Sequence, residues 1–308
     1  MSDPKLKNIP ASVRQKLLNL SRERNEDFQL LLTKYGLERV LVRLSTSKHR
    51  DVFILKGALL FELWTHERYR PTRDADFLAT GDNSPQRFAA IFREICSTEI
   101  PGDGIRFDPT SVRAERIKED ADYEGLRVTF IGTLDSAHIP IQIDVGFGDT
   151  VTPGPVPTEY PTLLGLPNPH LLAYPRETVV SEKLEAMVKL GMTNTRMKDF
   201  HDLYTLSRTF EFDGKTLAEA VSATFQKRQT ELPPTGEPLA FTAEFYDDPN
   251  KVKQWRAYET KNRPYVAEAD LKDIADRLRA FLGPVLRSLR ESRLFHGSWS
   301  PAEGWKLN

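Results

Sequence analysis

The stretch that decides the fold begins with Phe53-Ile-Leu-Lys-Gly-Ala-Leu-Leu60 and continues at Asp74-Ala-Asp-Phe77. Its apolar first half predicts a short strand, and Gly57 predicts the turn into a helix over 59–64. A second strand is expected over 75–79. A strand, a glycine turn, a helix and a strand with paired carboxylates form an arrangement that suits phosphate groups and cations.

The paired carboxylates are expected on one side of the second strand, because side chains alternate between the two faces. Asp74 and Asp76 therefore share a face. A later strand predicted over 139–147 carries Asp144, which becomes a third carboxylate of the cluster if that strand pairs beside 75–79. Hard oxygen ligands of this kind select Mg²⁺ or Mn²⁺. An isolated Asp-x-Asp is more often a strand edge or a turn, but the glycine turn upstream favours a metal site.

Phosphate-binding residues are expected at the glycine turn. Gly57 lets backbone N–H groups approach a phosphate, and Lys56 beside it carries an ammonium group. Thr72, two residues before Asp74, has two interpretations. Its hydroxyl either satisfies backbone groups of the turn after Pro71, or touches the substrate or is modified. A phosphate on Thr72 would crowd the carboxylates and block the pocket.

The pattern along the chain predicts an α+β fold, in which a mixed sheet with flanking helices is followed by a helical domain. Residues 151–169 contain six prolines and form the best internal boundary. We therefore expect an α/β domain over 1–150 and a mainly helical domain over 151–308 that completes the active-site cleft. Ser12 with Gln15 is interpreted as a capping box that opens the first helix. Further elements are predicted as helices over 85–96, 178–190, 197–208, 217–228 and 271–289, and strands over 110–118 and 125–134, with a corner at Asp135-Ser136.

The helical half adds a lysine and two further carboxylates. Lys183 lies beside the apolar side of its helix, so it either points into a cleft or is an ordinary solvated lysine. Arg196, Asp199 and Asp202 share a face of the next helix, because they lie three residues apart. One interpretation is a plain Arg196–Asp199 ion pair. In the other, Asp199 orients Lys183, or Asp202 helps to place substrate, with Arg196 as a further substrate-binding candidate. Lys183 would then neutralise charge that develops on a triphosphate.

Composition and charge exclude several classes of protein. The 308 residues are 39% hydrophobic and 28% charged, which excludes collagen-like and wholly disordered chains. Neither a membrane-spanning stretch nor an apolar signal segment is visible, and the single Cys96 excludes a disulfide framework or a Cys-rich metal site. We expect a soluble cytoplasmic protein that does not bind membranes.

The net charge of −1 hides a division along the chain. Residues 1–50 carry 11 Lys and Arg against 5 Asp and Glu, residues 51–250 carry 20 against 32, and residues 251–308 carry 12 against 7. The basic flanks are either ordinary solvated helix faces or surfaces that meet a polyanion.

Five motifs in order resemble those of the AbiEii/AbiGii family of nucleotidyltransferase-like toxins, which includes the mycobacterial MenT toxins. They span residues 54–204, and no motif covers the chain after about 210. The motifs are Leu55-Lys-Gly-Ala58, Arg70-Pro-Thr-Arg-Asp-Ala-Asp-Phe77, Ile141-Gln-Ile-Asp-Val-Gly-Phe-Gly-Asp149, Pro175-Arg-Glu-Thr-Val-Val-Ser-Glu-Lys-Leu-Glu-Ala-Met187 and Arg196-Met-Lys-Asp-Phe-His-Asp-Leu203.

The resemblance implies a toxin of a bacterial toxin–antitoxin or phage-defence pair that uses Mg²⁺ (or Mn²⁺) and a nucleoside triphosphate. MenT toxins add nucleotides to the 3′ end of tRNA, so the implied partners are tRNA or another RNA and a cognate antitoxin. Carried over by motif, the metal-binding pair is Asp74 and Asp76, and the hydroxyl before it is Thr72. The catalytic lysine is Lys183, and the final acidic motif is Asp199 with Asp202. One position departs from the usual Gly-Ser turn of the superfamily, because Ala58 follows Gly57. Lys56 or the backbone alone would then take over the phosphate contact of the serine.

The sequence thus predicts a Mg²⁺-dependent nucleotidyltransferase. Asp74 and Asp76 would hold two ions about 3.5–4 Å apart, with Asp144 as a further ligand or a general base. Gly57 and Lys56 would bind phosphate, and Lys183 would stabilise the departing pyrophosphate. Two alternatives remain: a phosphotransferase or nuclease that uses the same metals, and a non-catalytic nucleotide-binding partner of an antitoxin.

Overall fold

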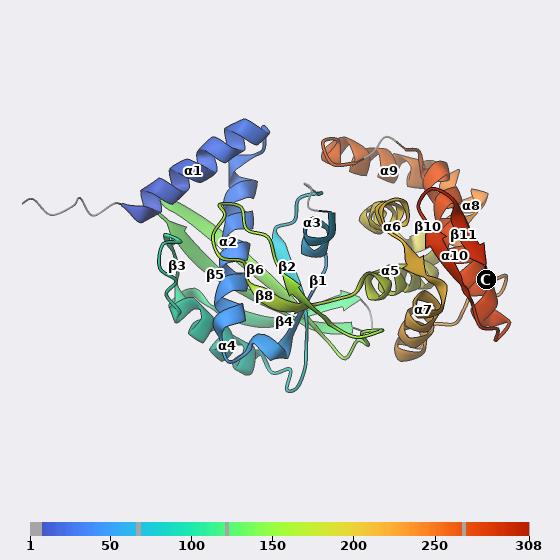
Figure 1. Ribbon diagram of the computed structural model, residues 1–308, viewed down its shortest axis with the longest axis horizontal. Coiled ribbons are helices and arrows are strands. Elements are labelled where there is room, and N and C mark those ends of the chain that lie inside the picture. Colours follow the sequence, from blue (N-terminus) through green and yellow to red (C-terminus); the bar gives the residue numbers. More distant parts are fainter. Residues whose placement is uncertain (1–7, 66–68, 121–122, 267–268, 308) are drawn as a thin grey trace, which may run out of the picture. The chain divides into compact units, whose positions relative to one another are not determined.

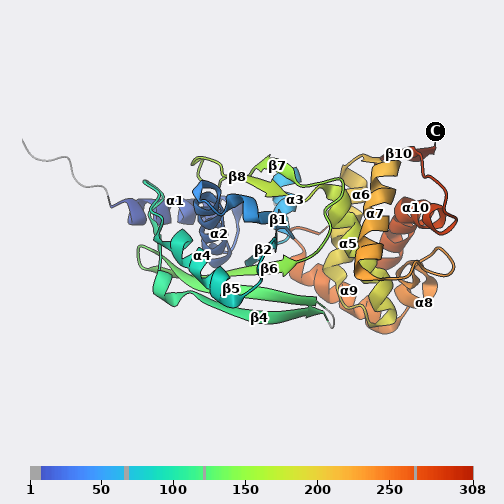
Figure 2. The same ribbon diagram turned by 90° about the horizontal axis from the view of Figure 1, so that it is seen from below.

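The computed structural model describes residues 8–65, 69–120, 123–266 and 269–307. The chain forms two compact units. Unit 1 comprises residues 1–148 and 156–173, and unit 2 comprises residues 149–155 and 174–308. Figures 1 and 2 show the elements of each unit in two views, and each unit is described by itself below.

Unit 1 is built on a mixed sheet of eight strands. Their order is β3-β5-β6-β2-β1-β8-β7, and β4 pairs with β5. β2 runs parallel to β6 and antiparallel to β1, and β1 runs parallel to β8. The strands are β1 (Phe53–Lys56), β2 (Asp74–Ala79), β3 (Ile105–Phe107), β4 (Arg113–Asp120), β5 (Tyr123–Leu134), β6 (Ala137–Phe147), β7 (Val156–Glu159) and β8 (His170–Ala173).

One face of this sheet is apolar and packs against two helices, α2 (Phe28–Thr46) and α4 (Pro85–Ser97). Gly36 of α2 lies so close to the sheet that a Cβ atom there would stand 2.7 Å from Cδ1 of Ile141. On the side of α4, the ring of Phe53 packs edge-on against the rings of Phe77, Phe88 and Phe92. These contacts fix which face of each strand is buried, and so also which side chains are left on the opposite face.

Two further helices complete unit 1, α1 (Ile9–Arg24) and α3 (Leu59–Thr65). The predicted capping box at Ser12 is wrong, because α1 begins earlier. Asn8 caps this helix by accepting a hydrogen bond from the N–H of Ala11, and Pro10 occupies its first turn, where a missing N–H costs nothing.

Unit 2 is mainly helical, as predicted. Several of its helices begin after an aspartate that accepts a hydrogen bond from a backbone N–H group of the first turn, namely Asp213, Asp248 and Asp270. The helices are α5 (Arg176–Leu190), α6 (Met197–Thr209), α7 (Gly214–Arg228), α8 (Ala243–Tyr246), α9 (Pro249–Asn262) and α10 (Leu271–Arg290). A small antiparallel sheet that we did not predict joins β9 (Phe212–Asp213), β10 (Gly297–Ser300) and β11 (Gly304–Leu307).

The predicted fold class, an α+β fold with a mixed sheet followed by helices, is confirmed. The division into units agrees closely with the expected boundary at residue 150 except for residues 156–173. Residues 156–173, which the prolines made us assign to the second domain, belong to unit 1 because β8 pairs with β1 and β7 pairs with β8. None of the helices in the described part of the chain combines the length and the apolarity that a membrane crossing needs.

Candidate active site

The turn between β1 and α3 brings backbone against a carboxylate. Gly57 has a φ of +77°, a conformation that side chains other than glycine rarely adopt. A Cβ atom on Gly57 would stand only 1.9 Å from Oδ2 of Asp76. Gly57 is therefore required for two reasons, its backbone conformation and the close approach of the Asp76 carboxylate. The sequence predicted that this glycine lets backbone N–H groups approach a phosphate, and that stays a prediction; the group that its Cβ would meet in the structure is the Asp76 carboxylate.

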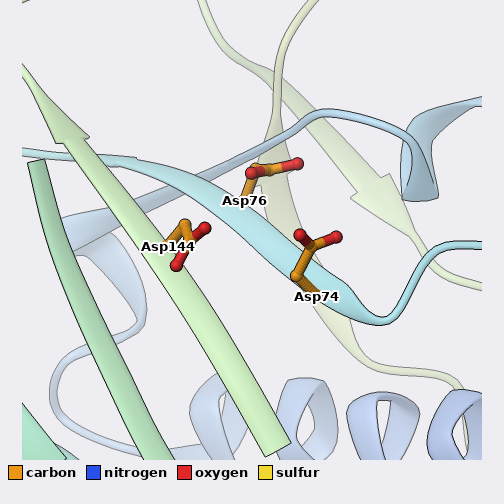
Figure 3. A group of neighbouring side chains, drawn as sticks. All are labelled: Asp74, Asp76 and Asp144. Carbon is orange, nitrogen blue, oxygen red and sulfur yellow. The ribbon is translucent and has the colours of Figure 1, made fainter. Parts of the chain in front are cut away.

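Three carboxylates lie together on the face of the sheet opposite α2 and α4. The parallel pairing of β2 with β6 places Asp76 directly beside Asp144, and Asp74 lies two residues along β2 on the same face. Each of the three offers an oxygen atom, and these oxygens lie within 4.8 Å of one another. Figure 3 shows the three side chains on two neighbouring strands. We call Asp74, Asp76 and Asp144 the carboxylate triad. The expected pairing of the 139–147 strand beside 75–79 is thus confirmed.

The chemistry of the triad fits a divalent cation. Mg²⁺ binds oxygen ligands at about 2.1 Å, so two ligands on opposite sides of one ion stand about 4.2 Å apart. The oxygens of the triad lie within 4.8 Å of one another, which is close to that spacing. All three donors are hard carboxylate oxygens, which suit Mg²⁺ or Mn²⁺. Without a cation, three close negative charges repel one another.

Thr72 lies against the triad. Its hydroxyl donates a hydrogen bond to Oδ1 of Asp74 and also lies 3.5 Å from the backbone oxygen of Asp74. Thr72 therefore orients a triad carboxylate. This role differs from both interpretations that the sequence left open, a contact with the backbone of the turn and a contact with substrate. Thr72 holds the side chain of Asp74 while keeping the turn before β2 in shape.

Lys56 reaches across the sheet toward the triad. Its backbone is paired with Asp76, and its Nζ atom lies 3.0 Å from the point that a Cβ atom on Gly146 would occupy. Gly146 lies on β6, one strand beyond β2 and two residues after Asp144. The ammonium group of Lys56 therefore extends over β2 on the same face as the triad. A phosphate group bound beside the triad would lie near this positive charge.

Arg127 is a residue of the site that sequence reasoning missed. It lies on β5 directly opposite Asp144 and donates through Nε to Oδ1 (2.8 Å) and through Nη2 to Oδ2 (2.7 Å). This hydrogen bond holds the pKa of Arg127 above its ordinary value. The sequence does contain a signal for this contact, namely the two-residue corner Asp135-Ser136. If the two strands form a hairpin around this corner, residue 127 pairs with residue 144.

The predicted site residues of the helical half lie together in unit 2. Nζ of Lys183 on α5 lies 2.5 Å from Oδ1 of Asp199 and 2.8 Å from Oδ2 of Asp202, both on α6. Nε of Arg196 lies 2.6 Å from Oδ2 of Asp199. The plain ion pair and the orienting contact to Lys183 therefore both exist, and they share one carboxylate. We call Lys183, Arg196, Asp199 and Asp202 the lysine cluster.

Burial sets the electrostatics of the lysine cluster. The side chain of Asp199 is 1% exposed and that of Asp202 is completely buried. Burial alone would raise the pKa of Asp199, but the charges of Lys183 and Arg196 outweigh burial and lower it. Asp199 is thus held as a carboxylate. The side chain of Lys183 is 14% exposed, so it is less deeply buried than the two carboxylates that it contacts.

The structure thus arranges the ten predicted site residues as two groups. Unit 1 holds Lys56, Gly57, Thr72, Asp74, Asp76 and Asp144, and unit 2 holds Lys183, Arg196, Asp199 and Asp202. His201, which is part of the Arg196–Leu203 motif, is buried beside the ring of Tyr258. Cys96 is buried on α4, and burial raises the pKa of its thiol to about 12, so it is not a nucleophile.

A mixed sheet with a glycine turn, paired carboxylates on the next strand and a third carboxylate on the neighbouring strand defines a nucleotidyltransferase-type protein. Residues 39–280 match the model of one such family, described as "Nucleotidyl transferase AbiEii toxin, Type IV TA system". This match covers more than half of the chain, and the chain therefore belongs to the AbiEii family, as its motifs predicted. No curated protein matches the chain.

Two solved structures resemble the chain distantly. One is described as a "putative nucleotidyltransferase from H. pylori", with a TM-score of 0.47, 14% identity, and coverage of 86% of this chain and 96% of the other. The second is JHP933 from Helicobacter pylori, with a TM-score of 0.44, 15% identity, and coverage of 86% and 94%. Likeness of this degree carries no argument about function.

Family membership makes the protein a toxin of the nucleotidyltransferase class. Such an enzyme takes a nucleoside triphosphate, generally with a divalent metal, and a toxin of a toxin–antitoxin system has an antitoxin partner. The carboxylate triad supplies a group of residues that suits the metal.

Proposed function

We propose that the protein transfers a nucleotide from a nucleoside triphosphate to an RNA acceptor, the 3′ end of tRNA, and thereby blocks translation. The observation that carries this proposal is the carboxylate triad beside Gly57 and Lys56, in a chain of the AbiEii family. In this reaction the acceptor hydroxyl gives up its proton to a base and its oxygen attacks the α-phosphorus. A new P–O bond forms, the bond between the α-phosphorus and the oxygen that bridges to the β-phosphorus breaks, and pyrophosphate leaves with the electrons of that bond.

The residues of unit 1 prepare this attack. Asp74, Asp76 and Asp144 are proposed to hold Mg²⁺ or Mn²⁺, and a bound pair of such ions lowers the pKa of the acceptor hydroxyl and offsets phosphate charge. Thr72 fixes the orientation of Asp74. Lys56 adds a positive charge on the triad's face, where it can meet a phosphate oxygen in place of the serine that Ala58 replaces.

The lysine cluster of unit 2 is proposed to stabilise the leaving pyrophosphate. Lys183 provides the charge, and Asp199 and Asp202 hold its ammonium group from one side. A lysine held in this way needs no reorganisation when charge develops on the leaving group. Because the Asp202 carboxylate is buried against Lys183, the suggestion that Asp202 touches substrate itself gives way to a role in placing Lys183.

The exposed basic residues of the two flanks are proposed to hold the RNA backbone. Residues 1–50 have an excess of six positive charges, and residues 251–308 have an excess of five. Arg39, Arg43 and Lys251 are buried and take no part in this contact. Contacts of Lys and Arg with phosphates release counterions, so the affinity for RNA would fall as the salt concentration rises.

The test is an incubation of the protein with total bacterial RNA, Mg²⁺ and each α-labelled nucleoside triphosphate in turn. We expect label in the tRNA fraction, tRNA longer at its 3′ end on sequencing, and release of pyrophosphate. RNA that becomes shorter indicates a nuclease, and phosphate transfer to another molecule indicates a phosphotransferase. Binding of nucleotide without pyrophosphate release indicates a non-catalytic partner of the antitoxin. Each of these three results would overturn the proposal.

A further inference from the structure

Charged residues form an aligned row across five neighbouring strands of unit 1. In spatial order the row consists of Lys56 on β1, Asp76 on β2, Asp144 on β6, Arg127 on β5 and Glu115 on β4. Two adjacent carboxylates are thus flanked by two positive charges. The triad as a whole carries three negative charges, so the balance on this face depends on Lys56 and Arg127.

The three carboxylates are not held alike. Both oxygens of Asp144 accept hydrogen bonds from Arg127, and Oδ2 also accepts one from Nε2 of Gln142 at 3.2 Å. The carboxylate of Asp74 accepts a hydrogen bond from the hydroxyl of Thr72, a neutral group. Asp144 is 7% exposed, whereas Asp74 and Asp76 are more open. Both oxygens of Asp144 are thus engaged by a protein cation, and a divalent ion at the triad would share this carboxylate with Arg127.

A fork of two N–H groups fixes the position of a carboxylate by binding both of its oxygens. The side chain of Arg127 is 36% exposed, so this pairing is not needed to rescue a fully buried arginine. Asp144 is nearly buried, so the pairing also supplies the charge that its carboxylate needs inside the protein. The pairing also affects cation binding, because the positive charge in contact with Asp144 repels any divalent cation that approaches the triad.

We propose that Arg127 is a positioning residue that holds Asp144 in place and lowers the affinity of the nucleotide-free triad for divalent cations. Asp74 and Asp76 then form the primary cation site, and Asp144 contributes an oriented oxygen beside it. Binding of the negatively charged triphosphate next to the triad adds charge of the opposite sign and offsets the repulsion from Arg127. Productive loading of the site is thereby coupled to the nucleotide. This inference rests on the proposed metal-binding role of the triad.

The test is a Mn²⁺ titration of the nucleotide-free protein, followed by electron paramagnetic resonance of the free ion. Four variants are compared with the wild type. Arg127→Met and Arg127→Gln remove the charge, Arg127→Lys keeps the charge without the fork, and Arg113→Met removes the same charge from an exposed position on β4. Circular dichroism and thermal unfolding verify that each variant is folded.

We expect Arg127→Met and Arg127→Gln to bind Mn²⁺ about tenfold more tightly than the wild type, because a repelling charge is gone. Arg127→Lys and Arg113→Met should stay within about threefold of the wild type. An unchanged or weaker Mn²⁺ affinity in the folded neutral variants overturns the proposal, because a merely structural ion pair would give that result. The two neutral variants differ in shape, so a folding defect in one leaves the other for the test.

A second measurement separates positioning from charge. At saturating Mn²⁺ and nucleotide, Arg127→Lys should lower kcat about tenfold with little change in KM for the nucleotide, because one ammonium group cannot fix both oxygens of Asp144. A wild-type kcat in Arg127→Lys contradicts the positioning role. The Mn²⁺ titration needs no transfer reaction, so loss of the proposed RNA activity and failure of this inference remain distinguishable.

Discussion

The two clusters of carboxylates and basic groups in this protein differ in how their charges are balanced. The carboxylate triad of unit 1 places three acidic side chains on one face of a sheet, with one of them bound to Arg127. The lysine cluster of unit 2 has two acidic side chains matched by two basic ones, all in contact. The first cluster keeps an excess of negative charge, and the second neutralises itself.

Burial explains why the two clusters differ. Asp199 and Asp202 lie in the interior of a helical unit, where an unpaired charge would cost several kcal/mol, so they require partners from the protein. Asp74 and Asp76 are only partly buried at the start of a strand, where solvent screens their repulsion until a cation arrives. An excess of carboxylates is tolerated where a ligand can supply the missing charge, and this difference separates a site for cations from a cluster whose charges balance within the protein.

The largest effect is expected from the triad itself. Asp74→Ala should reduce nucleotide incorporation into RNA by about 10³-fold or more, because a ligand of the reacting ions is lost. The measurement is the initial rate with labelled triphosphate at saturating Mg²⁺. Asp82→Ala is the matched control, since Asp82 also accepts a hydrogen bond from a hydroxyl two residues away, that of Ser84, but is exposed and outside the triad. Full activity of a folded Asp74→Ala protein would sink the proposed mechanism.

In the lysine cluster the main effect is expected on stability. Lys183→Met removes the charge that two buried carboxylates share, which should cost about 3–5 kcal/mol of unfolding free energy. The control Lys215→Met removes an exposed i,i+4 partner of Glu219 and should cost less than about 0.5 kcal/mol. Urea unfolding of both variants gives the comparison. Equal midpoints for the two variants would show that the cluster does not depend on Lys183.

The glycine turn provides a test of geometry at constant charge. Gly57→Ala places a methyl group into the Asp76 carboxylate and should lower activity about 10²-fold, the size of effect that a misplacement of 1 Å can have. Gly102→Ala is the control, because Gly102 has a similar φ of +87° and no atom within 4 Å of the added Cβ. Both variants bear comparable backbone strain. If both lose activity equally, the contact with Asp76 is not what the glycine protects.

The smallest expected effect is a dependence of stability on pH in unit 2. The folded-state pKa of Asp199 lies below its ordinary value of 3.8, so its contribution is present above about pH 3.8 and is lost as the pH falls through the folded pKa. Asp199→Asn should therefore flatten the fall of the urea midpoint below pH 4. Asp135→Asn, an exposed control whose left-handed φ asparagine tolerates, should keep the wild-type slope. The opposite ranking of slopes would contradict the ion-pairing of Asp199.

Much of the triad was predictable because strands obey short rules. Alternation placed Asp74 and Asp76 on one face, and the polar position of Asp144 opposite a row of isoleucines placed it on the matching face of its own strand. The partner Arg127 follows from the hairpin register as well, although this step requires counting pairs back from the corner and not only finding motifs.

Other parts depend on contacts that no local pattern contains. The run His170–Ala173 is four residues between prolines, and it becomes a strand only because β1 offers it a partner. The approach of Lys183 to Asp199 joins two helices through packing, so the sequence could offer this partner on α5 only as one of two interpretations, whereas the shared face on α6 followed directly from spacing. Residues 156–173 were assigned to the wrong side of the boundary for the same reason, since prolines permit edge strands.

The claim that the open triad, and not the neutral lysine cluster, binds the divalent cation can be tested by calorimetric titration of Mn²⁺ into three proteins. The account predicts that the wild type and Asp202→Asn bind the ion with similar affinity, and that Asp74→Asn has lost the binding heat. Binding that persists in Asp74→Asn and disappears in Asp202→Asn would place the cation at the lysine cluster and contradict the account.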